Sequence, residues 1–499
     1  MRYILKHKNI ALALFDYSNN SIVHLLLNKD SVEMLPLPVK LILRADNIET
    51  EKENIIVADE EGCLKFDVWL SDRAVPVGRA NYEKYLSEPK EGIEWLLQNS
   101  CFSFTDCYYT VKVDNDLSWE EVRDSFSMLD EMITIENNSN SPNFRYKGHN
   151  SALGGQLEKY WFNNDNKLYL CKKNEERYEI LSIREVIASM IYKRQGFSAC
   201  DYKLIKKNDA VTGCICASFV NDDKIEFVSA FDLLQEYALS QDNNVYEMII
   251  KLAALKGCSE EEVSRYMDMM VLVDYLINNR DRHEGNIGFL RDSDTLRVIS
   301  PVPVYDSGSS LKMEGSMPCN SNDMSVNGLY PTQQECLRHV TNFSVLNLAL
   351  LPTAEEIRNV LNEGKFISEE KKEEFLMFYE KRKAFIKEMQ SDNGKSLQPV
   401  DKDRIDRENA MNLFRVCYKG KMKRQINDAQ RTTLELKYND YVMSIDFGEC
   451  TIKISNAENH VSKTEIVDAG AKREINSAQK QLKEFLKEYG YEWMDRHFK

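Results

Sequence analysis

Two aspartates and an asparagine in the middle of the chain have the types and the spacing of a phosphoryl-transfer site. Asp281 lies five residues before Asn286, and Asp306 follows twenty residues after Asn286. In such a site the first Asp orients the attacking hydroxyl or accepts its proton, while the Asn and the later Asp hold Mg²⁺ against the phosphates of ATP. We therefore interpret Asp281 as the catalytic base and Asn286 and Asp306 as the Mg²⁺ ligands.

A long helix must deliver the loop that contains Asp281. Ser259 begins a capping-box pattern, and apolar residues then recur with the 3.6-residue period of a buried helix as far as Ile277. The helix is predicted to end there, so the loop leaves from its C-terminus. The alternative interpretation is that Asn278 to Asp281 form only a helix-ending turn.

A β-hairpin must return Asp306 to the neighbourhood of Asn286. Ile287–Leu290 and Leu296–Ile299 are apolar runs separated by a polar turn, which predicts two short strands. Oxygen ligands on adjacent strand ends suit octahedral Mg²⁺. The alternative is that Asp306 only caps a turn. We expect His283 to be a structural, hydrogen-bonding residue of the loop rather than a base or a ligand.

A turn rich in Ser and Gly lies directly before a predicted hairpin whose second strand is Leu168–Lys172. Its glycines let backbone N–H groups approach phosphate oxygens, because no Cβ stands in the way. An ordinary tight turn is the alternative. The turn is not a Walker A loop, because no Gly-Lys-Ser/Thr follows. The residues that we assign to phosphate binding are Ser151, Gly154, Gly155 and Gln156.

A lysine and a glutamate downstream of this turn have the order of the ion pair that kinases need. Lys172 ends an apolar strand, and Glu185 lies in a helix predicted to open at Ser182. A kinase holds its phosphate-binding strand Lys with a helix Glu. Ser182 and Glu185 also form a capping-box pattern, in which the Glu would only return to the N–H of the cap. Both interpretations stay open, and Lys173 is the alternative to Lys172.

The strand predicted over Gly213–Val220 has the position of a hinge between two lobes. This position places the backbone groups of Ala217 and Phe219 where adenine would bind, although a buried edge strand explains the same pattern. Cys214 and Cys216 are separated by one residue, which puts both on one face of the strand. That spacing lacks the ligand gap of a zinc site.

An Asp-Phe-Gly sequence near the end of the chain, starting at Asp446, is not part of this site. It lies 160 residues after Asn286, between two β-like runs at Tyr441–Ile445 and Cys450–Ile454. A hairpin turn explains this arrangement. We assign Asp446 no metal role.

The composition is that of an ordinary folded protein with an acidic balance. The net charge of -15 makes non-specific nucleic-acid binding unfavourable, so we expect no direct nucleic-acid contact. No apolar run approaches the length of a membrane span, and we expect no membrane association. The twelve scattered cysteines lack a disulfide or zinc pattern, and together with the absence of a targeting segment they indicate the cytoplasm.

These residues resemble the HipA family of bacterial Ser/Thr kinases over roughly residues 145 to 390. The resemblance implies ATP and Mg²⁺ as cofactors, a protein substrate and an antitoxin-like partner, and it gives Ser151 as the loop serine whose autophosphorylation silences the enzyme. The sequence departs from the family pattern by an extra residue in the Gly-rich loop and by the region after about residue 400. The matching elements are Ser151–Lys159, Leu170–Lys172, Arg184–Val186, Asn279–Asn286 and Pro303–Asp306.

The fold that follows is α+β, with a bilobal protein-kinase-like centre between two additions. An N-terminal β-rich subdomain with a connecting helix, 1–136, is expected to contain a hairpin from Ile10 to Leu27 and strands at Leu64–Leu70 and Cys107–Val113. Residues 137–143 are read as a linker. The remaining expected parts are a kinase N-lobe at 145–235, a C-lobe at 236–390 and a C-terminal α/β extension at 400–499.

Three functions are compatible with these patterns. The first is an ATP- and Mg²⁺-dependent, autophosphorylating Ser/Thr protein kinase, which the presence of every acidic catalytic position favours. The second is a pseudokinase-like binding or regulatory module, and the third is a kinase that acts on a small molecule or lipid. Residues 311–330 are read as a substrate-facing loop. The sequence does not identify the substrate.

Overall fold

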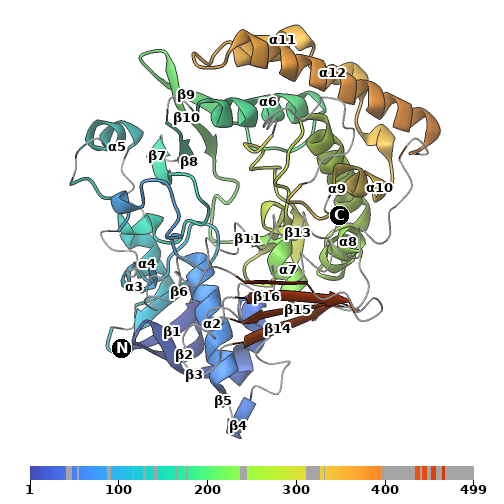
Figure 1. The fold of residues 1–499 in the computed structure, drawn as a ribbon. Helices are drawn as coiled ribbons and strands as arrows, with labels where there is room; N and C mark the ends of the chain where they lie inside the picture. The colour runs from blue at the N-terminus through green and yellow to red at the C-terminus, as the bar shows by residue number, and fades with distance from the viewer. Residues whose placement is uncertain are drawn as a thin grey trace. The chain divides into compact units, whose positions relative to one another are not determined.

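The computed structural model describes most of the first four hundred residues and four strands after them. The chain divides into two units, Met1–Pro399 and Val400–Lys499. Helices and antiparallel sheets together make the first unit an α+β fold (Figure 1). The domain boundaries expected within that unit stay predictions. The described residues are 1–40, 48–52, 55–86, 92–115, 117–126, 131–139, 141, 143–164, 167–175, 178–236, 244–310, 326–330, 332–394, 397, 433–438, 441–446, 451–456 and 463–466.

Six antiparallel strands form the sheet at the N-terminus, in the order β4-β5-β3-β2-β1-β6. The hairpin predicted between Ile10 and Leu27 is confirmed, with a turn shorter than expected. Asn19 and Asn20 both have a positive φ, 51° and 63°, which matches the tight turns that join twisted strands. The strands are β1 Arg2–His7, β2 Ile10–Ser18, β3 Ser21–Asn28, β4 Ile48–Lys52, β5 Ile55–Ala58 and β6 Tyr108–Lys112.

The strand predicted at Leu64–Leu70 is wrong, because this segment belongs to helix α2, Glu60–Arg73. Apolar residues at every second position suggested a strand. The buried residues instead follow helical spacing at Cys63, Phe66 and Leu70, and the helix packs against β3. The overlooked signal was Asp59, whose side chain accepts a hydrogen bond from Gly62 N and caps the helix.

Short helices connect this sheet to the rest of the unit. The helix expected near Ser118 is present and begins with a capping box between Ser118 and Glu121. It ends at Ser125, and a separate helix then enters the segment expected to be a linker. The elements are α1 Leu37–Lys40, α3 Gly92–Gln98, α4 Trp119–Ser125, α5 Met132–Asn138, and the 3₁₀ turns η1 Lys29–Met34, η3 Tyr82–Lys84 and η5 Gly148–Asn150.

A four-stranded antiparallel sheet in the order β7-β8-β10-β9 follows, with helix α6 against it. The predicted strand around Lys172 is confirmed, and the strand predicted across 213–220 is present but ends at Ala217. Cys214 and Cys216 are both buried on one face of β10, as expected. The elements are β7 Lys159–Asn164, β8 Lys167–Lys173, α6 Ile180–Arg194, β9 Lys203–Lys207 and β10 Ala210–Ala217.

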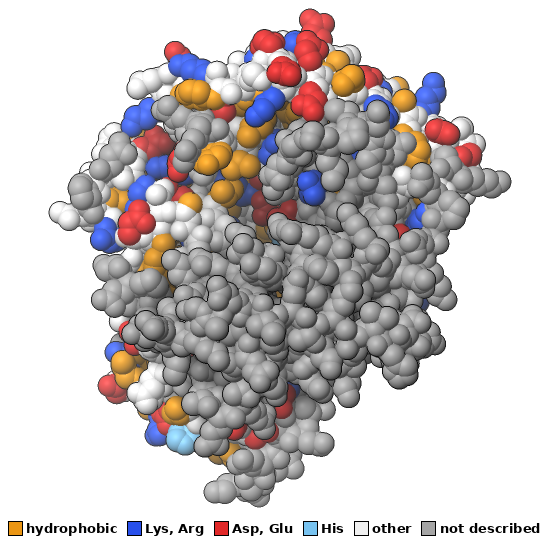
Figure 2. Space-filling view, in the orientation of Figure 1, with side chains coloured by type: hydrophobic (Ala, Val, Ile, Leu, Met, Phe, Trp, Pro, Cys, Tyr) orange, Lys and Arg blue, Asp and Glu red, His pale blue; other side chains and the backbone are white. Residues whose placement is uncertain are grey.

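Helices dominate the remainder of the first unit, and α9 lies at its centre. Helix α9, Glu260–Leu276, is capped by Ser259 as predicted, and its second half is buried on all sides. Acidic and basic side chains intermingle over α11 and α12 on the face shown in Figure 2. The other elements are β11 Ile225–Ser229, β12 Gly288–Asp292, β13 Val298–Pro301, α7 Ala230–Glu236, α8 Val245–Leu255, η7 Glu284–Asn286, α10 Gln333–Arg338, η8 Phe343–Val345, η9 Leu348–Leu350, α11 Ala354–Leu361 and α12 Glu369–Asp392.

The second unit contains a four-stranded antiparallel meander. Its hairpin at Asp446 is confirmed, because Asp446 at the end of β15 pairs with Thr451 at the start of β16. The expected final helix and residues 311–325 of the expected substrate-facing loop lie outside the described residues. No described helix combines the length and the apolar character needed to cross a membrane. The strands are β14 Thr433–Tyr438, β15 Tyr441–Asp446, β16 Thr451–Asn456 and β17 Lys463–Ile466.

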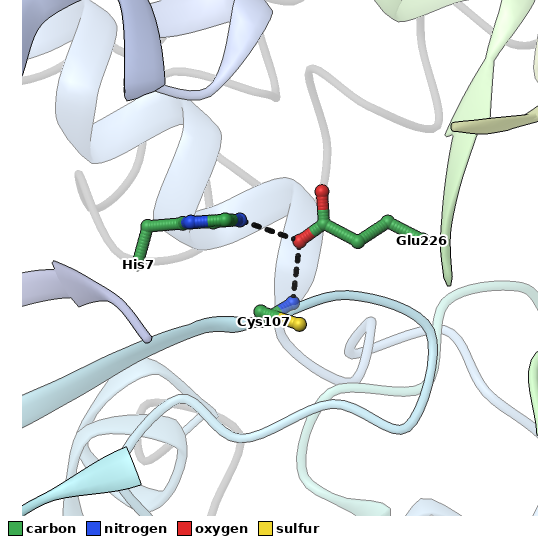
Figure 3. A group of neighbouring side chains, drawn as sticks. All are labelled: His7, Cys107 and Glu226. Atoms are coloured by element: carbon green, nitrogen blue, oxygen red, sulfur yellow. Dashed lines mark hydrogen bonds and ion pairs between the residues drawn. The ribbon is translucent and has the colours of Figure 1, made fainter. Parts of the chain in front are cut away.

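A buried carboxylate, Glu226 on β11, joins the N-terminal sheet to the helical part of the first unit. One of its oxygens accepts hydrogen bonds from His7 Nε2 at 2.8 Å and from Cys107 N at 2.7 Å (Figure 3). The other accepts from Arg291 Nε on β12 at 2.8 Å. Burial alone would raise the pKa of Glu226, but Arg291 and His7 lower it to about 2. The carboxylate therefore stays charged and fully bonded.

The same three side chains, His7, Cys107 and Glu226, bring potential metal-ligand atoms within 4.8 Å of one another. The thiol of Cys107 donates to Asp223 O, and burial raises its pKa far above the usual range, so it remains protonated. A metal would need the thiolate and would have to displace donors from a satisfied carboxylate beside Arg291. We therefore describe the group as a hydrogen-bonded ion-pair network.

Removing Arg291 should destabilise the protein strongly. Arg291→Met leaves the Glu226 carboxylate buried without its guanidinium partner, which costs about 3–5 kcal/mol for buried pairs. Urea unfolding measures the loss. Arg2→Ala, which removes the exposed pair with Asp16, is the control and should leave stability almost unchanged. Equal effects of the two substitutions would contradict this account.

Candidate active site

The loop predicted to carry the catalytic base is shaped by Asp274, a buried residue of α9. Its carboxylate accepts from Asn279 Nδ2 at 2.9 Å and from Arg282 Nε at 2.8 Å. The helix ends at Leu276 with Ile277 as its C-cap, and Asn278 then adopts a left-handed conformation with φ of 51°. Asn tolerates this conformation better than most residues. The loop is therefore folded back onto the helix that delivers it.

Arg282 joins the loop to the segment that contains Asp306. One guanidinium nitrogen donates to Asn286 O at 2.9 Å and to Tyr305 O at 2.5 Å, and the other donates to Ser307 Oγ at 3.0 Å. Burial would lower the pKa of Arg282, but Asp274 outweighs it and raises the pKa. The permanently charged side chain therefore holds the two predicted metal-ligand segments side by side.

Asp281 and Asn286 are directly linked within the loop. Asn286 Nδ2 donates to Asp281 O at 2.8 Å, and Asn286 Oδ1 makes no hydrogen bond with the described residues. One oxygen of the Asp281 carboxylate accepts from Asn327 Nδ2 at 2.5 Å, while Asn327 N donates to Arg280 O. Asn327 was missed from sequence, because it lies in a Ser- and Asn-rich stretch without a periodic signal. It fixes the orientation of the predicted base.

The predicted Lys–Glu pair is present and also includes Asp306. Lys172 Nζ donates to Glu185 Oε1 at 2.6 Å and to Asp306 Oδ1 at 2.8 Å. The second oxygen of Glu185 accepts from Ser307 N at 2.8 Å. The capping-box interpretation of Glu185 is wrong, because α6 begins at Ile180 and Ser182 already lies inside the helix.

Charge balance in this triad favours an ionised lysine. Burial would lower the pKa of Lys172, but Asp306 and Glu185 raise it well above its ordinary value. Burial raises the pKa of Glu185 despite its lysine partner, whereas Lys172 and Lys159 together lower the pKa of Asp306 against the effect of burial. Asp306 is thus the more strongly ionised carboxylate of the two.

The residues predicted to bind Mg²⁺ offer a suitable donor set. The Asp306 side chain is 41% exposed, and its backbone has a φ of 57°. A free amide oxygen on Asn286 and an accessible carboxylate on Asp306 are hard ligands of the kind that Mg²⁺ takes alongside phosphate oxygens and water. The residues therefore fit the ion, and the assignment of Asn286 and Asp306 as metal ligands stays a prediction.

Lys159 lies between the Gly-rich turn and this triad. The sequence did not reveal its importance. A Cβ added to Gly155, which has a φ of 89°, would meet Lys159 Nζ at 2.8 Å. Loss of water, together with the nearby Arg79 and Lys172, lowers the pKa of Lys159 to about 7, although Asp306 opposes this shift. Gly154, Gly155 and Gln156 are exposed. A second lysine is therefore available beside the loop.

The remaining predicted site residues lie at different distances from this network. The ring of Phe219 lies 5.9 Å from that of Tyr305, next to Asp306, at a tilt of 43°, whereas Ala217 is exposed at the end of β10. Ser151 is fully buried, and its hydroxyl has no hydrogen-bond partner among the described residues. No described hydrogen bond joins Ser151 or Ala217 to the catalytic residues.

His283 has the structural role that was expected. Its Nδ1 accepts a hydrogen bond from Gly285 N at 3.0 Å and caps the short turn that carries Asn286. A Cβ on Gly285 would come within 2.8 Å of the imidazole. The histidine therefore shapes the loop between the base and the first metal ligand.

Comparison with known proteins places this geometry in a family. Residues 151–365 match the family model described as the HipA-like C-terminal domain. This part of the chain therefore resembles the HipA-like C-terminal domain. The match contains the Gly-rich turn, Lys172, Glu185 and the whole Asp281–Asp306 segment, so the family assignment and the hydrogen-bonded network concern the same residues.

The individual relatives of this HipA-like chain are distant. It is 25% identical over 174 residues to the serine/threonine-protein kinase CtkA of Helicobacter pylori, covering 33% of this chain and spanning about half (52%) of that relative. The crystal structure of the Helicobacter pylori proinflammatory kinase CtkA shows 21% identity, with a TM-score of 0.38 over 50% of this chain and 95% of that one.

A further similar structure is a complex of HipA, HipB and operator DNA from Shewanella oneidensis. It has 12% identity and a TM-score of 0.43, and the comparison covers 78% of this chain and 99% of that one. The comparisons do not support the expectation that this chain avoids nucleic acid.

The affinity of the Gly-rich loop for polyphosphate should fall above neutral pH. Lys159 has a pKa of about 7, and an anion binds best to its protonated form. Affinity should therefore lose a factor approaching about tenfold for each pH unit above 7, because one proton must be taken up on binding. Titration calorimetry with inorganic tripolyphosphate between pH 6 and 9 measures this dependence.

Lys159→Met is the control, because it keeps the titration of tripolyphosphate itself and removes that of the lysine. The difference between the two proteins isolates the contribution of Lys159. An identical pH dependence in both would show that Lys159 does not bind the anion.

Proposed function

We propose that this HipA-like chain is an ATP- and Mg²⁺-dependent Ser/Thr protein kinase with a bilobal, protein-kinase-like arrangement. The observation that carries the proposal is the Lys172–Glu185–Asp306 triad, which is joined through Ser307 and Arg282 to the loop that contains Asp281. A Lys–Glu pair together with a metal-binding Asp is the arrangement that activates phosphoryl transfer in kinases.

Each residue has a specific role in this mechanism. Asp281, held by Asn327, orients the hydroxyl of the substrate and accepts its proton. Lys172 binds the phosphates of ATP, and Asn286 and Asp306 hold Mg²⁺. The ion, when bound, neutralises charge that develops on the transferred phosphoryl group. The backbone near Ala217 and Phe219 binds adenine.

Autophosphorylation is part of the proposal, and the burial of Ser151 sets a condition for it. Its side chain is fully inaccessible, so transfer to Ser151 requires the segment after η5 to leave the position that it occupies here. A protein substrate and an antitoxin-like partner are also proposed, by analogy with the kinase and toxin–antitoxin proteins named among the similar proteins.

A binding module without catalysis is the second candidate. Its only structural support is that Asp281 and Asp306 already have protein partners, Asn327 and Lys172. The presence of every acidic position needed for transfer favours the enzyme. A small-molecule kinase would use the same residues and differ only in its acceptor.

Replacing the proposed base should abolish most activity. Asp281→Asn keeps the size of the side chain but removes its ability to take a proton, which should lower kcat by a factor of at least about 10². Transfer from γ-labelled ATP to the protein itself and to cell extract measures the rate. Mass spectrometry of the products identifies the phosphorylated residues.

Asp446→Asn is the matched control, because it alters the aspartate of the Asp-Phe-Gly sequence in the second unit. It should retain wild-type transfer. Equal rates for wild type and Asp281→Asn, or no transfer by the wild type to any acceptor, would refute the kinase assignment.

A further inference from the structure

A segment of the N-terminal region, residues 79–85, runs alongside the Gly-rich loop and bonds to nearly all of it. Arg79 donates to the backbone carbonyls of Leu153, Gly154 and Gly155, with Nη2–O of 2.6 Å at Gly154 and Nε–O of 3.1 Å at Gly155. The N–H of Ala80 donates to the next carbonyl, that of Gln156, at 2.7 Å. Four successive loop carbonyls therefore accept hydrogen bonds from Arg79 and Ala80, on one side of the loop.

The same segment also fixes the end of the loop. Asn81 Nδ2 donates to one oxygen of the Glu158 carboxylate at 2.5 Å. Lys84 Nζ donates to the other oxygen at 3.0 Å. The hydroxyl of Tyr85 donates to Lys159 O at 2.5 Å and accepts from Lys159 N at 2.9 Å. Residues 79–85 thus act as a template along the whole length of the loop.

Capturing the carbonyls determines where the loop N–H groups point. In a trans peptide unit the C=O and the following N–H point in opposite directions. Since the four carbonyls face residues 79–80, the N–H groups of Gly154, Gly155, Gln156 and Leu157 face away from them. None of these N–H groups donates to another described backbone group. Convergent, unused N–H groups form an anion-binding nest.

Two features show that this arrangement is specific. In a nest a left-handed residue lies next to a right-handed one, and Gly155 supplies the left-handed residue with a φ of 89°. The approach is also close, because a Cβ on Gly78 would come within 2.8 Å of Gln156 Oε1. The positive φ of Gly155 therefore requires a glycine, whereas the flexible Gln156 side chain could move away from a Cβ at Gly78.

The charges around the loop also favour an anion. Arg79 is 3% exposed and lies over the ring of Tyr85 at 5.0 Å. Its Nε and Nη2 donate to neutral carbonyls, and its buried Nη1 has no hydrogen-bond partner among the described residues. Lys159 Nζ has no carboxylate within ion-pair distance among the described residues. The nearby Glu158 is already bonded to Asn81, Lys84 and Tyr146. A positive charge beside the nest is left for a ligand.

We propose that Arg79 is a positioning residue of the nucleotide site, which turns the loop N–H groups toward the phosphates of the nucleotide. The inference rests on the proposed function and extends it, because it makes the N-terminal segment a structural part of the phosphate-binding site. The ligand class is a polyphosphate, either free or as part of a nucleoside triphosphate.

The test compares Arg79→Met and Arg79→Lys with the wild type in the full-length chain. Binding of Mg-ATP, of adenosine and of inorganic tripolyphosphate is measured by calorimetry, and hydrogen exchange is measured on the peptide covering 150–158 without ligand. Arg73→Met is the control for the loss of a buried arginine outside the loop. Arg73 donates to the backbone carbonyls of Cys101 and Tyr108 and to the Asp106 carboxylate, but to no group in the loop, so the variant also controls for general destabilisation.

In Arg79→Met, exchange in the loop should rise and affinity for Mg-ATP and tripolyphosphate should fall by about tenfold or more, because several oriented hydrogen bonds to the anion are lost. Adenosine affinity should stay within about twofold, since adenosine lacks phosphates. Arg79→Lys should be intermediate, because a lysine cannot reproduce the guanidinium fork. Arg73→Met should change none of these quantities.

Two results would overturn the inference. One is that Arg79→Met leaves hydrogen exchange in the loop and polyphosphate affinity unchanged. The other is an equal loss of ATP and adenosine binding, because that result indicates a general structural role for Arg79. Failure of the proposed function looks different. A wild type that binds tripolyphosphate in an Arg79-dependent way but binds neither ATP nor adenosine would keep the nest and refute the nucleotide-dependent kinase.

Discussion

Lys172 has its ammonium group in a buried position between two carboxylates, and this charge constrains the elements around it. A buried ammonium is costly unless it is paired and hydrogen-bonded. Glu185 on α6 and Asp306 beyond β13 supply the pairing, so β8, α6 and the segment after β13 must meet at one point. The same constraint leaves Asp306 ionised and partly accessible, as a metal ligand needs to be.

A second buried charge continues this network into the catalytic loop. Arg282 is paired with Asp274 on α9, and its remaining donors hold Asn286, Tyr305 and Ser307. Ser307 in turn bonds to Glu185. The orientation of the proposed base, the metal ligands and the ATP lysine therefore follows from two buried ion pairs that share one short segment. Displacing either pair would disturb the whole site.

Much of the local structure could be predicted from sequence because its signals are short-range. Periodicity and a capping residue predicted α9 with its start after Ser259, and short apolar runs predicted β8 and β10. The same reasoning failed at α2, where strand-like alternation and helical spacing coincide and only the capping Asp59 distinguishes them. The Lys172–Glu185 ion pair could be predicted from the order of the two residues along the chain. Its connection to Asp306 through Ser307 could not be predicted in this way.

The residues that sequence reasoning missed make contacts across long separations. Arg79, Lys159 and Asn327 belong to no periodic pattern, and each acquires its role from a loop folded elsewhere in the chain. Arg79 also changes the interpretation of the N-terminal region. Its segment lies along the loop that we propose binds phosphate, so this region contributes directly to the geometry of the proposed site.

The most direct test of the central claim is to locate the metal. A crystal of the full-length chain with Mn²⁺ and a non-hydrolysable ATP analogue, measured with anomalous scattering, shows the ion independently of any activity. The account predicts a peak within about 2–2.5 Å of Asn286 Oδ1 and an Asp306 carboxylate oxygen, in contact with the phosphates. A peak only at His7, Cys107 and Glu226, or a nucleotide bound without metal at Asp306, would contradict it.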